Sequence, residues 1–492
     1  MRSLAVLVSL LLTLTAAAQP IDTKAIDKLM TSAMRAWQIP GAAVAVVRND
    51  RVVYVNGYGT KELGGPDPVT ADTLFQIAST SKAFTATALA MLATEGKLSF
   101  DDPVRKHVGY FHLSDVCADT NVTLRDILSH RTGLKRHDAL WDNTPATRED
   151  VVRSMGQVAL TKPFRTAYQY QNIMFITAGE AVASASGMPW DDFVRTRIFQ
   201  PLGMTRTVLT DEEWAKADHA VGYRYDPKTD RIAPQRPIDT ATIGAGGGIK
   251  SSARDLANWL RFQLSGGAFD LRQLVDPALL EETKMPQTVI RVENSTRDAN
   301  PETNVMSYGL GWVIQDYRGE LLVSHSGALN GFRTHVDLLP RRNTGFVVLI
   351  NTGRSMAATA MRNGLADLLT NKNGRDWNPY YLMIERKVND KEARELAERN
   401  AKRVAGTTPT HPLARYAGEY TNGAYGKALV SIVDDKLVLQ WNRMTVPLTH
   451  FHYDVLNALS EYDEVDEQVT FGLDPTKEVK TLTLFGETFE RK

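Results

Sequence analysis

Ser79 and Lys82 form the ends of a Ser-Thr-Ser-Lys tetrad, an S-x-x-K spacing. On a helix, this three-residue offset places the serine hydroxyl and the lysine amine on one face. A serine hydroxyl becomes a strong nucleophile when a neighbouring base takes its proton, and a lysine can be that base if its surroundings lower its pKa. The tetrad therefore predicts proton transfer from Ser79 to Lys82. The alternative is an ordinary helix N-cap beside a solvated lysine.

Two other polar motifs follow further along the chain. Tyr170 and Asn172 form a Y-x-N triplet, and His325 and Gly327 form an H-x-G triplet that closes a predicted strand. Taken singly, each motif has a structural explanation: a core aromatic, a helix cap, or a strand histidine with satisfied hydrogen bonds. Their order along the chain, with each motif on a fitting predicted element, favours a catalytic set.

The order S-x-x-K, Y-x-N and H-x-G resembles that of the serine β-lactamase-like family, specifically its class C-like and its esterase and D-aminopeptidase branches. The likeness extends over about residues 25–355. Its supporting segments are LRDILSHRTGL at Leu124–Leu134, QPLGM at Gln200–Met204, GAGGGIKSSARDLANWL at Gly244–Leu260 and SHSGALNGF at Ser324–Phe332.

The resemblance implies a role for each motif residue. Ser79 would be acylated, Lys82 would be its base, and Tyr170 would carry protons to and from the attacking and leaving groups. The backbone N–H groups of Ser79 and Ala328 would form an oxyanion hole. No metal or cofactor is required. The implied substrate-binding residues are Asn172, His325, Gly327 and Ala328.

His325 stands where β-lactamases and penicillin-binding proteins usually carry the lysine of K-T-G. A histidine is mostly neutral above its ordinary pKa of about 6.5, so the charge that would bind a substrate carboxylate is weakened. We therefore expect little β-lactam turnover beside activity on short-chain esters or small amides. Arg333, just past the end of the H-x-G strand, is a candidate substitute cation, with a surface strand residue as the alternative.

A hairpin, a helix and a group of later strands must position these motifs. Gly41–Arg48 and Arg51–Tyr58 are strand-like around an Asn-Asp turn, and apolar residues at helical spacing predict a helix from Ser79 to Gly96. Residues 101–261 are expected to be predominantly helical. With the hairpin, four later strands would form one antiparallel sheet: Gly309–Gln315, Glu320–His325, Phe332–Leu339 and Gly345–Ile350.

These elements predict an α+β or α/β chain of the β-lactamase-like type, with an antiparallel sheet flanked by helices and a helical subdomain. A small all-β barrel, similar to the lipocalin-like domain of one subset of the family, would follow. Its strand-like runs are Arg415–Tyr420, Lys427–Val433, Lys436–Trp441, Thr445–Phe451, Glu467–Gly472 and Val479–Phe485. The expected divisions are a signal peptide at 1–18, a serine hydrolase domain at 19–375, a charged helical connector at 376–410 and the barrel at 411–492.

The whole-chain composition limits the partners. Lys plus Arg and Asp plus Glu both number 57 in the 492 residues, so no net charge would attract nucleic acid or an anionic membrane. The chain starts with Arg2, an apolar run at Leu4–Leu14 and alanines at Ala16–Ala18, the pattern of a signal peptide removed near Ala18. We expect an exported protein, periplasmic or secreted, with no membrane span after signal removal.

Cys117 is the only cysteine, so no intramolecular disulfide can form, and we expect this residue to be buried as a small hydrophobe. The expected partner is a small-molecule or peptide substrate, and a homo-oligomer is left open.

The preferred function is a serine hydrolase that cleaves a peptide or amide, D-amino-acid-containing ones included, or an ester through an acyl-enzyme on Ser79. One alternative is a penicillin-binding or sensor protein that acylates without efficient turnover, because no separate deacylation carboxylate can be identified. A weak β-lactamase is a second alternative. A third is an inactive scaffold whose barrel binds a partner, and the intact set of motifs argues against it.

Overall fold

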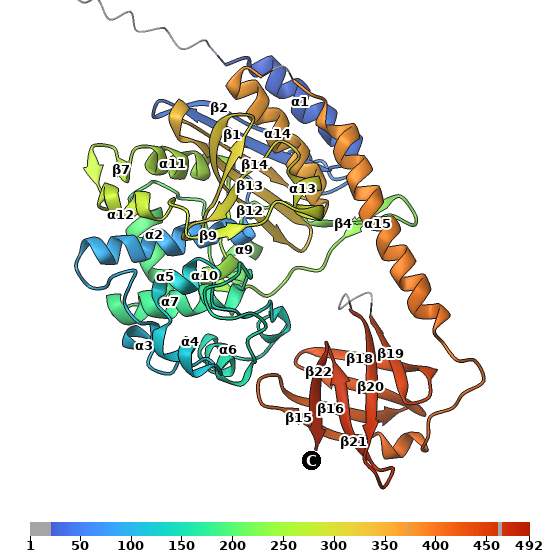
Figure 1. The fold of residues 1–492 in the computed structure, drawn as a ribbon. Coiled ribbons are helices and arrows are strands. Elements are labelled where there is room, and N and C mark those ends of the chain that lie inside the picture. Colours follow the sequence, from blue (N-terminus) through green and yellow to red (C-terminus); the bar gives the residue numbers. More distant parts are fainter. Residues whose placement is uncertain (1–20, 373, 461–464) are drawn as a thin grey trace, which may run out of the picture.

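The computed structural model describes residues 21–372, 374–460 and 465–492. Figure 1 shows a body of sheet and helices, a long helix that leaves it, and a separate barrel. This architecture agrees with the predicted fold class. The expected signal peptide at 1–18 lies outside the described residues.

The body is built on an eight-stranded antiparallel sheet with the strand order β2-β1-β14-β13-β12-β11-β10-β9. Strands β1 and β14, the second and third in this order, are buried along nearly their whole length, because helices cover both faces of the sheet. The strand bounds are β1 Gly41–Arg48, β2 Arg51–Gly59, β9 Thr288–Ile290, β10 Met306–Tyr308, β11 Val313–Tyr317, β12 Glu320–Leu329, β13 Phe332–Leu339 and β14 Thr344–Ile350.

Helices α1, α14 and the start of α15 cover one face of this sheet, and α11 and the helical subdomain cover the other. The helix bounds are α1 Thr23–Trp37, α2 Ser81–Thr94, α3 Val104–His107, α4 Val116–Asn121, α5 Leu124–Leu128, α6 Arg148–Ser154, α7 Asn172–Ser186, α8 Trp190–Val194, α9 Asp211–Lys216, α10 Gly244–Gly247, α11 Ala253–Leu264, α12 Pro277–Glu282, α13 Asn294–Ala299, α14 Ser355–Thr370 and α15 Trp377–Ala401. Three pairs of short strands complete the body: β3 Phe75–Gln76 with β6 Lys250–Ser251, β4 Tyr223–Asp226 with β5 Arg231–Pro234, and β7 Ala268–Phe269 with β8 Arg272–Gln273.

Helix α2 is the central helix of the body, and almost all of its side chains are buried. Its Phe84 stacks on Trp259 of α11 with ring centroids 3.7 Å apart, and α2 also packs against α7. A helix that is apolar all round must be covered on every side. This packing places the N-terminal end of α2 at a defined position beside the sheet.

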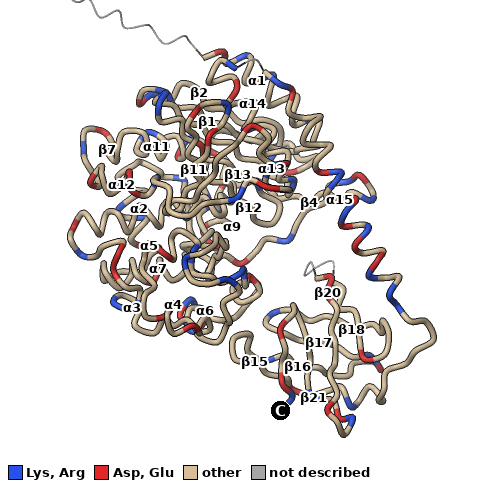
Figure 2. The backbone as a smooth tube through the Cα atoms, viewed as in Figure 1, with Lys and Arg blue, Asp and Glu red and all other residues tan. Residues whose placement is uncertain are grey.

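Helix α15 leads from the body to the barrel. Trp377, Tyr381 and Ile384 bury its first turns against the sheet body, whereas the rest is mostly exposed. Figure 2 shows acidic and basic residues interspersed along this exposed part. A segment without an apolar stripe has little to bury, so it acts as a spacer. The helix lies within the connector range expected from the sequence.

The barrel is closed, because each strand pairs with the next and β15 pairs with β22. Buried and exposed side chains alternate along strands such as β17 and β18, as a filled barrel requires. Strands β19 and β22 lie outside the runs expected from the sequence. The strand bounds are β15 Gly418–Asn422, β16 Gly426–Val433, β17 Lys436–Trp441, β18 Met444–His452, β19 Val455–Ser460, β20 Val465–Leu473, β21 Val479–Leu484 and β22 Glu487–Arg491.

Two local expectations are wrong. Cys117 is exposed on α4 instead of buried, because this short helix turns that side chain to solvent. The strand expected at Gly309–Gln315 begins only at Val313, as β11, and its first residues form the turn between β10 and β11, where Gly311 adopts a φ of 82°. Among the helices of the described residues, none combines the length and apolar character needed to cross a bilayer.

Candidate active site

Ser79 lies in a 3₁₀ turn, η1 (Ala78–Thr80), that leads directly into α2. From Thr73 to Leu92, Ser79 is the only residue that is not buried. Ala78, immediately before it, has a φ of 51°, in the left-handed region that residues with a side chain rarely adopt. Strain of this kind persists only where the surrounding packing maintains it. The strained turn presents the Ser79 hydroxyl at the surface of an otherwise buried segment.

The Lys82 amine lies beside this hydroxyl, with Nζ 3.2 Å from Ser79 Oγ. Its other two contacts are carbonyl oxygens, Asn172 Oδ1 at 2.7 Å and Gly246 O at 2.6 Å. A neutral amine has two N–H bonds and one lone pair. If the two N–H bonds donate to the two carbonyls, the lone pair faces the hydroxyl. In that form Lys82 can accept the proton of Ser79.

The surroundings of Lys82 favour this neutral form. Burial holds the pKa of Lys82 well below its ordinary value, because the ammonium group would lose its hydration. The positive charge of Arg136 lowers this pKa further, whereas the carboxylate of Asp138 raises it. Nζ also lies 4.8 Å from the centre of the Tyr170 ring.

Tyr170 stands in the loop before α7 and forms a hydrogen bond with Ser79. Burial raises the pKa of its phenol above the ordinary value, and the hydrogen bond to Ser79 opposes this rise. The phenol is therefore protonated at neutral pH and can donate a proton. His130 supports the Tyr170 ring at a centroid distance of 4.3 Å, while its Nδ1 accepts the backbone N–H of Gln171 at 3.1 Å.

Asp138 is a member of this cluster that the sequence motifs do not identify. Its Oδ1 accepts from Asn172 Nδ2 at 2.9 Å and from Trp141 Nε1 at 2.8 Å. Its Oδ2 accepts from Arg136 Nε at 2.7 Å. Asn172 therefore lies between Lys82 and Asp138, with both ends of its amide engaged.

Strand β12 brings the H-x-G motif to Ser79. A Cβ atom on Gly327 would lie 2.1 Å from the carbonyl oxygen of Ile77, so glycine allows the strand to approach η1 this closely. Pairing between β12 and β11 ends at Ser324, whereas pairing with β13 continues to the end of the strand. The end of β12 is thus an edge that faces Ser79, and Ala328 lines the same pocket. A backbone N–H on such an edge can bind a developing oxyanion.

His325 lies behind the pocket, with an exposed fraction of 4%. Its Nδ1 is 2.7 Å from the carbonyl oxygen of Ser326, and its Nε2 is 2.8 Å from the Tyr308 hydroxyl. Because a carbonyl can only accept, Nδ1 carries the proton and the Tyr308 hydroxyl donates to Nε2. Burial and the charge of Lys82 lower the pKa of His325 to about 3. The imidazole is therefore neutral at neutral pH, and both of its nitrogens are engaged.

The pocket at Ser79 has a volume of about 290 Å³. Of the site residues predicted from the sequence, Ser79, Asn172 and Ala328 line it, whereas Lys82, Tyr170, His325 and Gly327 are not among the lining residues. The lining mixes charged, amide and apolar groups: Ser79, Arg136, Asp138, Trp141, Asp142, Asn172, Gln235, Ile238, Ile243, Gly247, Ala328, Leu329, Asn330 and Arg333.

Arg333 reaches the lining from β13, where it pairs with Ala328. Its Nε donates to the Ser355 hydroxyl at 2.7 Å, and its Nη1 donates to the carbonyls of Leu329 and Phe332 at 2.9 and 2.7 Å. Burial lowers the pKa of the guanidinium to about 10, so it is charged at neutral pH. Because these acceptors are neutral, the positive charge is available to a substrate anion.

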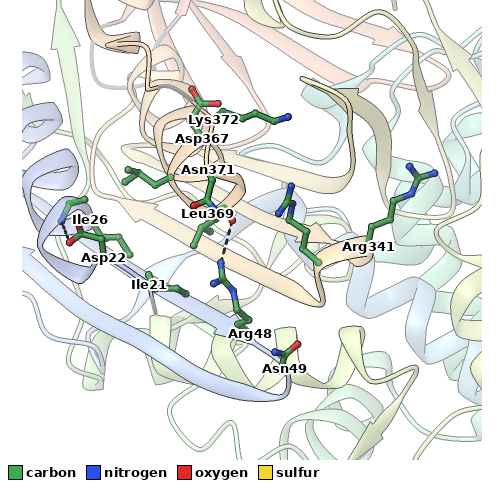
Figure 3. A pocket seen from close by; sticks show the side chains of 13 residues that line it. Ile21, Asp22, Ile26, Arg48, Asn49, Arg341, Asp367, Leu369, Asn371 and Lys372 are labelled. Atoms are coloured by element: carbon green, nitrogen blue, oxygen red, sulfur yellow. Dashed lines mark hydrogen bonds between the residues drawn. The ribbon is translucent and has the colours of Figure 1, made fainter. Parts of the chain in front are cut away.

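A second cavity of about 650 Å³ lies between the start of α1, the end of β1 and the end of α14. Figure 3 shows Arg48 in this cavity, donating to the carbonyl of Leu369 at 3.2 Å. Arg341, Arg342 and Lys372 add to its basic character, and its lining contains no serine, cysteine, threonine or histidine. The larger cavity therefore offers no nucleophile.

In the described ranges, no group of three or more His, Cys, Asp or Glu residues is placed to hold a metal ion.

Comparisons with known proteins agree with this architecture. A family model described as Beta-lactamase matches residues 26–371, and one described as a domain of unknown function (DUF3471) matches residues 402–491. The unguisins hydrolase ungD' of Aspergillus campestris is 32% identical over 431 residues, which are 83% of this chain and 77% of that protein.

Two solved structures share the fold. The octameric penicillin-binding protein homologue from Pyrococcus abyssi has a TM-score of 0.64 at 24% identity, over 95% of this chain and 100% of that one. A class C beta-lactamase from Rhodobacter sphaeroides has a TM-score of 0.57 at 24% identity, over 71% of this chain and 99% of that one.

Proposed function

The chain belongs to the beta-lactamase family of serine hydrolases, and from this premise we propose that it cleaves a peptide, amide or ester bond through an acyl-enzyme on Ser79. One observation carries the proposal. The buried Lys82 amine has two carbonyl acceptors for its N–H bonds, and its third contact is the Ser79 hydroxyl. A base held in this way needs no rearrangement to take the proton.

In the acylation step, Lys82 takes the proton of Ser79 as Oγ attacks the substrate carbonyl. The backbone N–H groups of Ser79 and Ala328 bind the oxyanion that develops on the carbonyl oxygen. Tyr170, whose phenol keeps its proton at neutral pH, gives that proton to the leaving group. The proton held by Lys82 then replaces the one that Tyr170 gave, so the site is neutral again.

Hydrolysis of the acyl-enzyme uses the same groups in reverse. Lys82 first takes the phenol proton of Tyr170, and the resulting phenolate accepts a proton from the water that attacks the acyl-enzyme ester. The protonated Lys82 then gives its proton to Ser79 Oγ as the ester bond breaks, which restores the neutral site. A chain that acylates without turnover is the second candidate. A burst of product followed by no steady rate would identify it.

The substrate class is a neutral ester or a small amide, D-amino-acid-containing peptides included, in preference to a β-lactam. The support is the neutral His325 at the position where β-lactamases usually carry a lysine. Arg333, which lines the pocket from β13, supplies a positive charge there in place of a lysine at position 325. Comparing steady-state rates on p-nitrophenyl esters, D-aminoacyl amides and nitrocefin tests this ranking.

Covalent labelling of Ser79 tests the acyl-enzyme. We expect a fluorophosphonate to modify the wild-type protein on the peptide that contains Ser79, as found by mass spectrometry, and to leave Ser79→Ala unmodified. The matched control is Ser326→Ala, which removes an exposed serine on the neighbouring strand and should label normally. A protein that hydrolyses esters but carries its adduct on another serine would contradict the proposal.

We also propose that this reaction takes place outside the cytoplasm. The support is the positive start, apolar run and alanine cleavage pattern of residues 1–18. Sequencing the N-terminus of the protein after expression in a secreting host tests it, and a retained Met1 would contradict it.

A further inference from the structure

Two loops that line the pocket at Ser79 also contact the barrel. The first, residues 135–143, contributes Arg136, Asp138, Trp141 and Asp142 to the lining. The second, residues 235–243, contributes Gln235, Ile238 and Ile243. We call these segments the first and second lip loops. Each of them is held by a hydrogen bond or an ion pair from a turn of the barrel.

Tyr425, in the turn between β15 and β16, holds the first lip loop. Its hydroxyl is 2.6 Å from His137 Nδ1, and both side chains are buried at the junction. The barrel fixes Tyr425 in turn, because Asn422 Oδ1 accepts its N–H at 3.0 Å and its carbonyl accepts Trp441 Nε1 at 2.9 Å. A rigid barrel residue thus binds the side chain directly before Asp138.

Arg443, in the turn between β17 and β18, contacts both lip loops at once. Its backbone N–H donates to the carbonyl of Asn143 at 3.2 Å, and its guanidinium forms an ion pair with Asp239. Asp239 follows Ile238, which lines the pocket. One barrel residue therefore links the two lip loops.

The junction also contains apolar contact, but it is incompletely filled. One cluster of buried hydrophobic residues runs from the body into the barrel, with Leu140 and Trp141 on one side and Tyr425 and Trp441 on the other. Beside it lies a cavity of about 390 Å³ lined by Leu140, Tyr425 and Trp441 among others. Because packing alone does not fill this space, the polar contacts must define the position of the first lip loop.

We propose that the barrel is a structural part of the active site, and that Tyr425 and Arg443 are positioning residues that hold the two lip loops against the pocket. This inference rests on the proposed function. Three hydrogen bonds connect the barrel with Lys82. Tyr425 bonds to His137, the next residue Asp138 accepts from Asn172, and Asn172 accepts from the Lys82 amine.

The inference predicts that the single change Tyr425→Phe loosens the first lip loop. Hydrogen–deuterium exchange in residues 135–143 should become several-fold faster, and kcat/KM on a p-nitrophenyl ester should fall about fivefold. Arg443→Met should affect both lip loops but less strongly, because its ion pair is partly exposed and the hydrogen bond to Asn143 comes from the backbone. In a protein that already carries His137→Ala, Tyr425→Phe should change neither the lip-loop exchange nor kcat/KM any further, since the hydrogen bond between the two residues is already absent.

Matched controls lie within the barrel. Tyr420→Phe removes an equally buried hydroxyl that donates to the Tyr416 carbonyl, and Arg415→Met removes an ion pair with Glu478. Neither contacts the body, so both should leave exchange in the lip loops and kcat/KM unchanged even if they lower the melting temperature.

Two results would overturn the inference. One is unchanged lip-loop exchange in Tyr425→Phe, and the other is an equal loss of kcat/KM in Tyr420→Phe. Failure of the proposed function gives a different result, because the wild-type protein itself would then fail to label at Ser79 while the exchange measurement still reports on the loops.

Discussion

At the scale of residues, the site separates the pKa values of two neighbouring groups in opposite directions. Burial lowers the pKa of the Lys82 amine and raises that of the Tyr170 phenol. Near neutral pH, one group is therefore biased toward its neutral basic form and the other keeps its proton. Pairs whose environments separate their pKa values in this way divide the roles of base and acid between them.

Charges beside Lys82 should shift the pH dependence in opposite directions. The neutral amine is the active form, so kcat/KM should rise with pH through the pKa of Lys82 and be lost as pH falls below it. Arg136 lowers that pKa, so Arg136→Gln should move the acidic limb to higher pH. Asp138 raises it, so Asp138→Asn should move the limb to lower pH while its amide oxygen still accepts from Asn172.

Rate profiles from pH 4 to 9 on a neutral ester measure both shifts. The control is Lys106→Gln, which removes an exposed charge from α3 and should leave the limb in place. If the acidic limb of the rate profile moved in the same direction in Arg136→Gln and in Asp138→Asn, Lys82 would not be the titrating base.

Arg333 should matter for anionic substrates only. Its guanidinium lines the pocket and bonds to neutral acceptors, so it can pair with a carboxylate on the substrate. We expect Arg333→Gln to lower kcat/KM about tenfold for a carboxylate-bearing ester and to change it little for the neutral analogue. Arg341→Gln, in the remote cavity, is the control. Equal losses on both esters would mean that Arg333 supports the fold of the pocket and does not bind charge.

At the scale of elements, the site is a contact between the 3₁₀ turn η1 and the edge of β12. The turn holds Ala78 at a positive φ, and the strand reaches it at Gly327, where a side chain would meet the Ile77 carbonyl. Neither element forms the site alone. Their close approach brings a nucleophile and an edge N–H to the same pocket.

The change Gly327→Ala tests this contact. The added methyl group would lie 2.1 Å from a backbone oxygen, so the strand must move away from η1 and the oxyanion hole must open. We expect a loss of about 100-fold in kcat, the order seen when an oxyanion donor is removed elsewhere, with a folded protein by circular dichroism. Gly109→Ala is the control, because a Cβ atom there meets open space. Full activity in Gly327→Ala would mean that β12 supplies no oxyanion donor.

At the scale of the whole molecule, the barrel and the body are connected twice. Helix α15 joins them covalently as a charged spacer, and the junction at the lip loops joins them by contact. Because the body has its own sheet with core residues on both faces, we expect it to fold without the barrel. The two lip loops that line its pocket, however, also bond to the barrel residues Tyr425 and Arg443.

A chain ending at Ala405 separates these two connections. We expect it to fold and to label at Ser79, but more slowly than the full chain, because the lip loops lose Tyr425 and Arg443. Its melting temperature should be lower, since Leu140, which lies beside Tyr425 and Trp441 at the junction, becomes more exposed. The full-length double variant Tyr425→Phe with Arg443→Met should label at a rate between those of the truncated and the full chain, because it keeps the backbone hydrogen bond to Asn143 and the apolar contacts of the junction. A truncated chain that does not fold would mean that the barrel is part of the folding core.

Features that depend on neighbours along the chain can be predicted from the sequence alone. The S-x-x-K tetrad, the hairpin at β1 and β2 and the exact run of β17 follow from local periodicity, because residues a few positions apart on one helix or strand have fixed relative directions. The order of the motifs pointed to the family that the comparisons show. The roles of the site residues, the domain boundaries and the signal peptide stay predictions.

Which distant segments come into contact is visible only in the folded chain. Asp138 contacts an asparagine 34 residues away, and Tyr425 contacts a histidine 288 residues away. The same holds for Arg333 in the pocket lining and for the closing strand β22, whose ETFER sequence has a single strongly apolar residue to mark it. Spacing cannot encode such contacts, because they depend on how several elements pack together and which surfaces remain free.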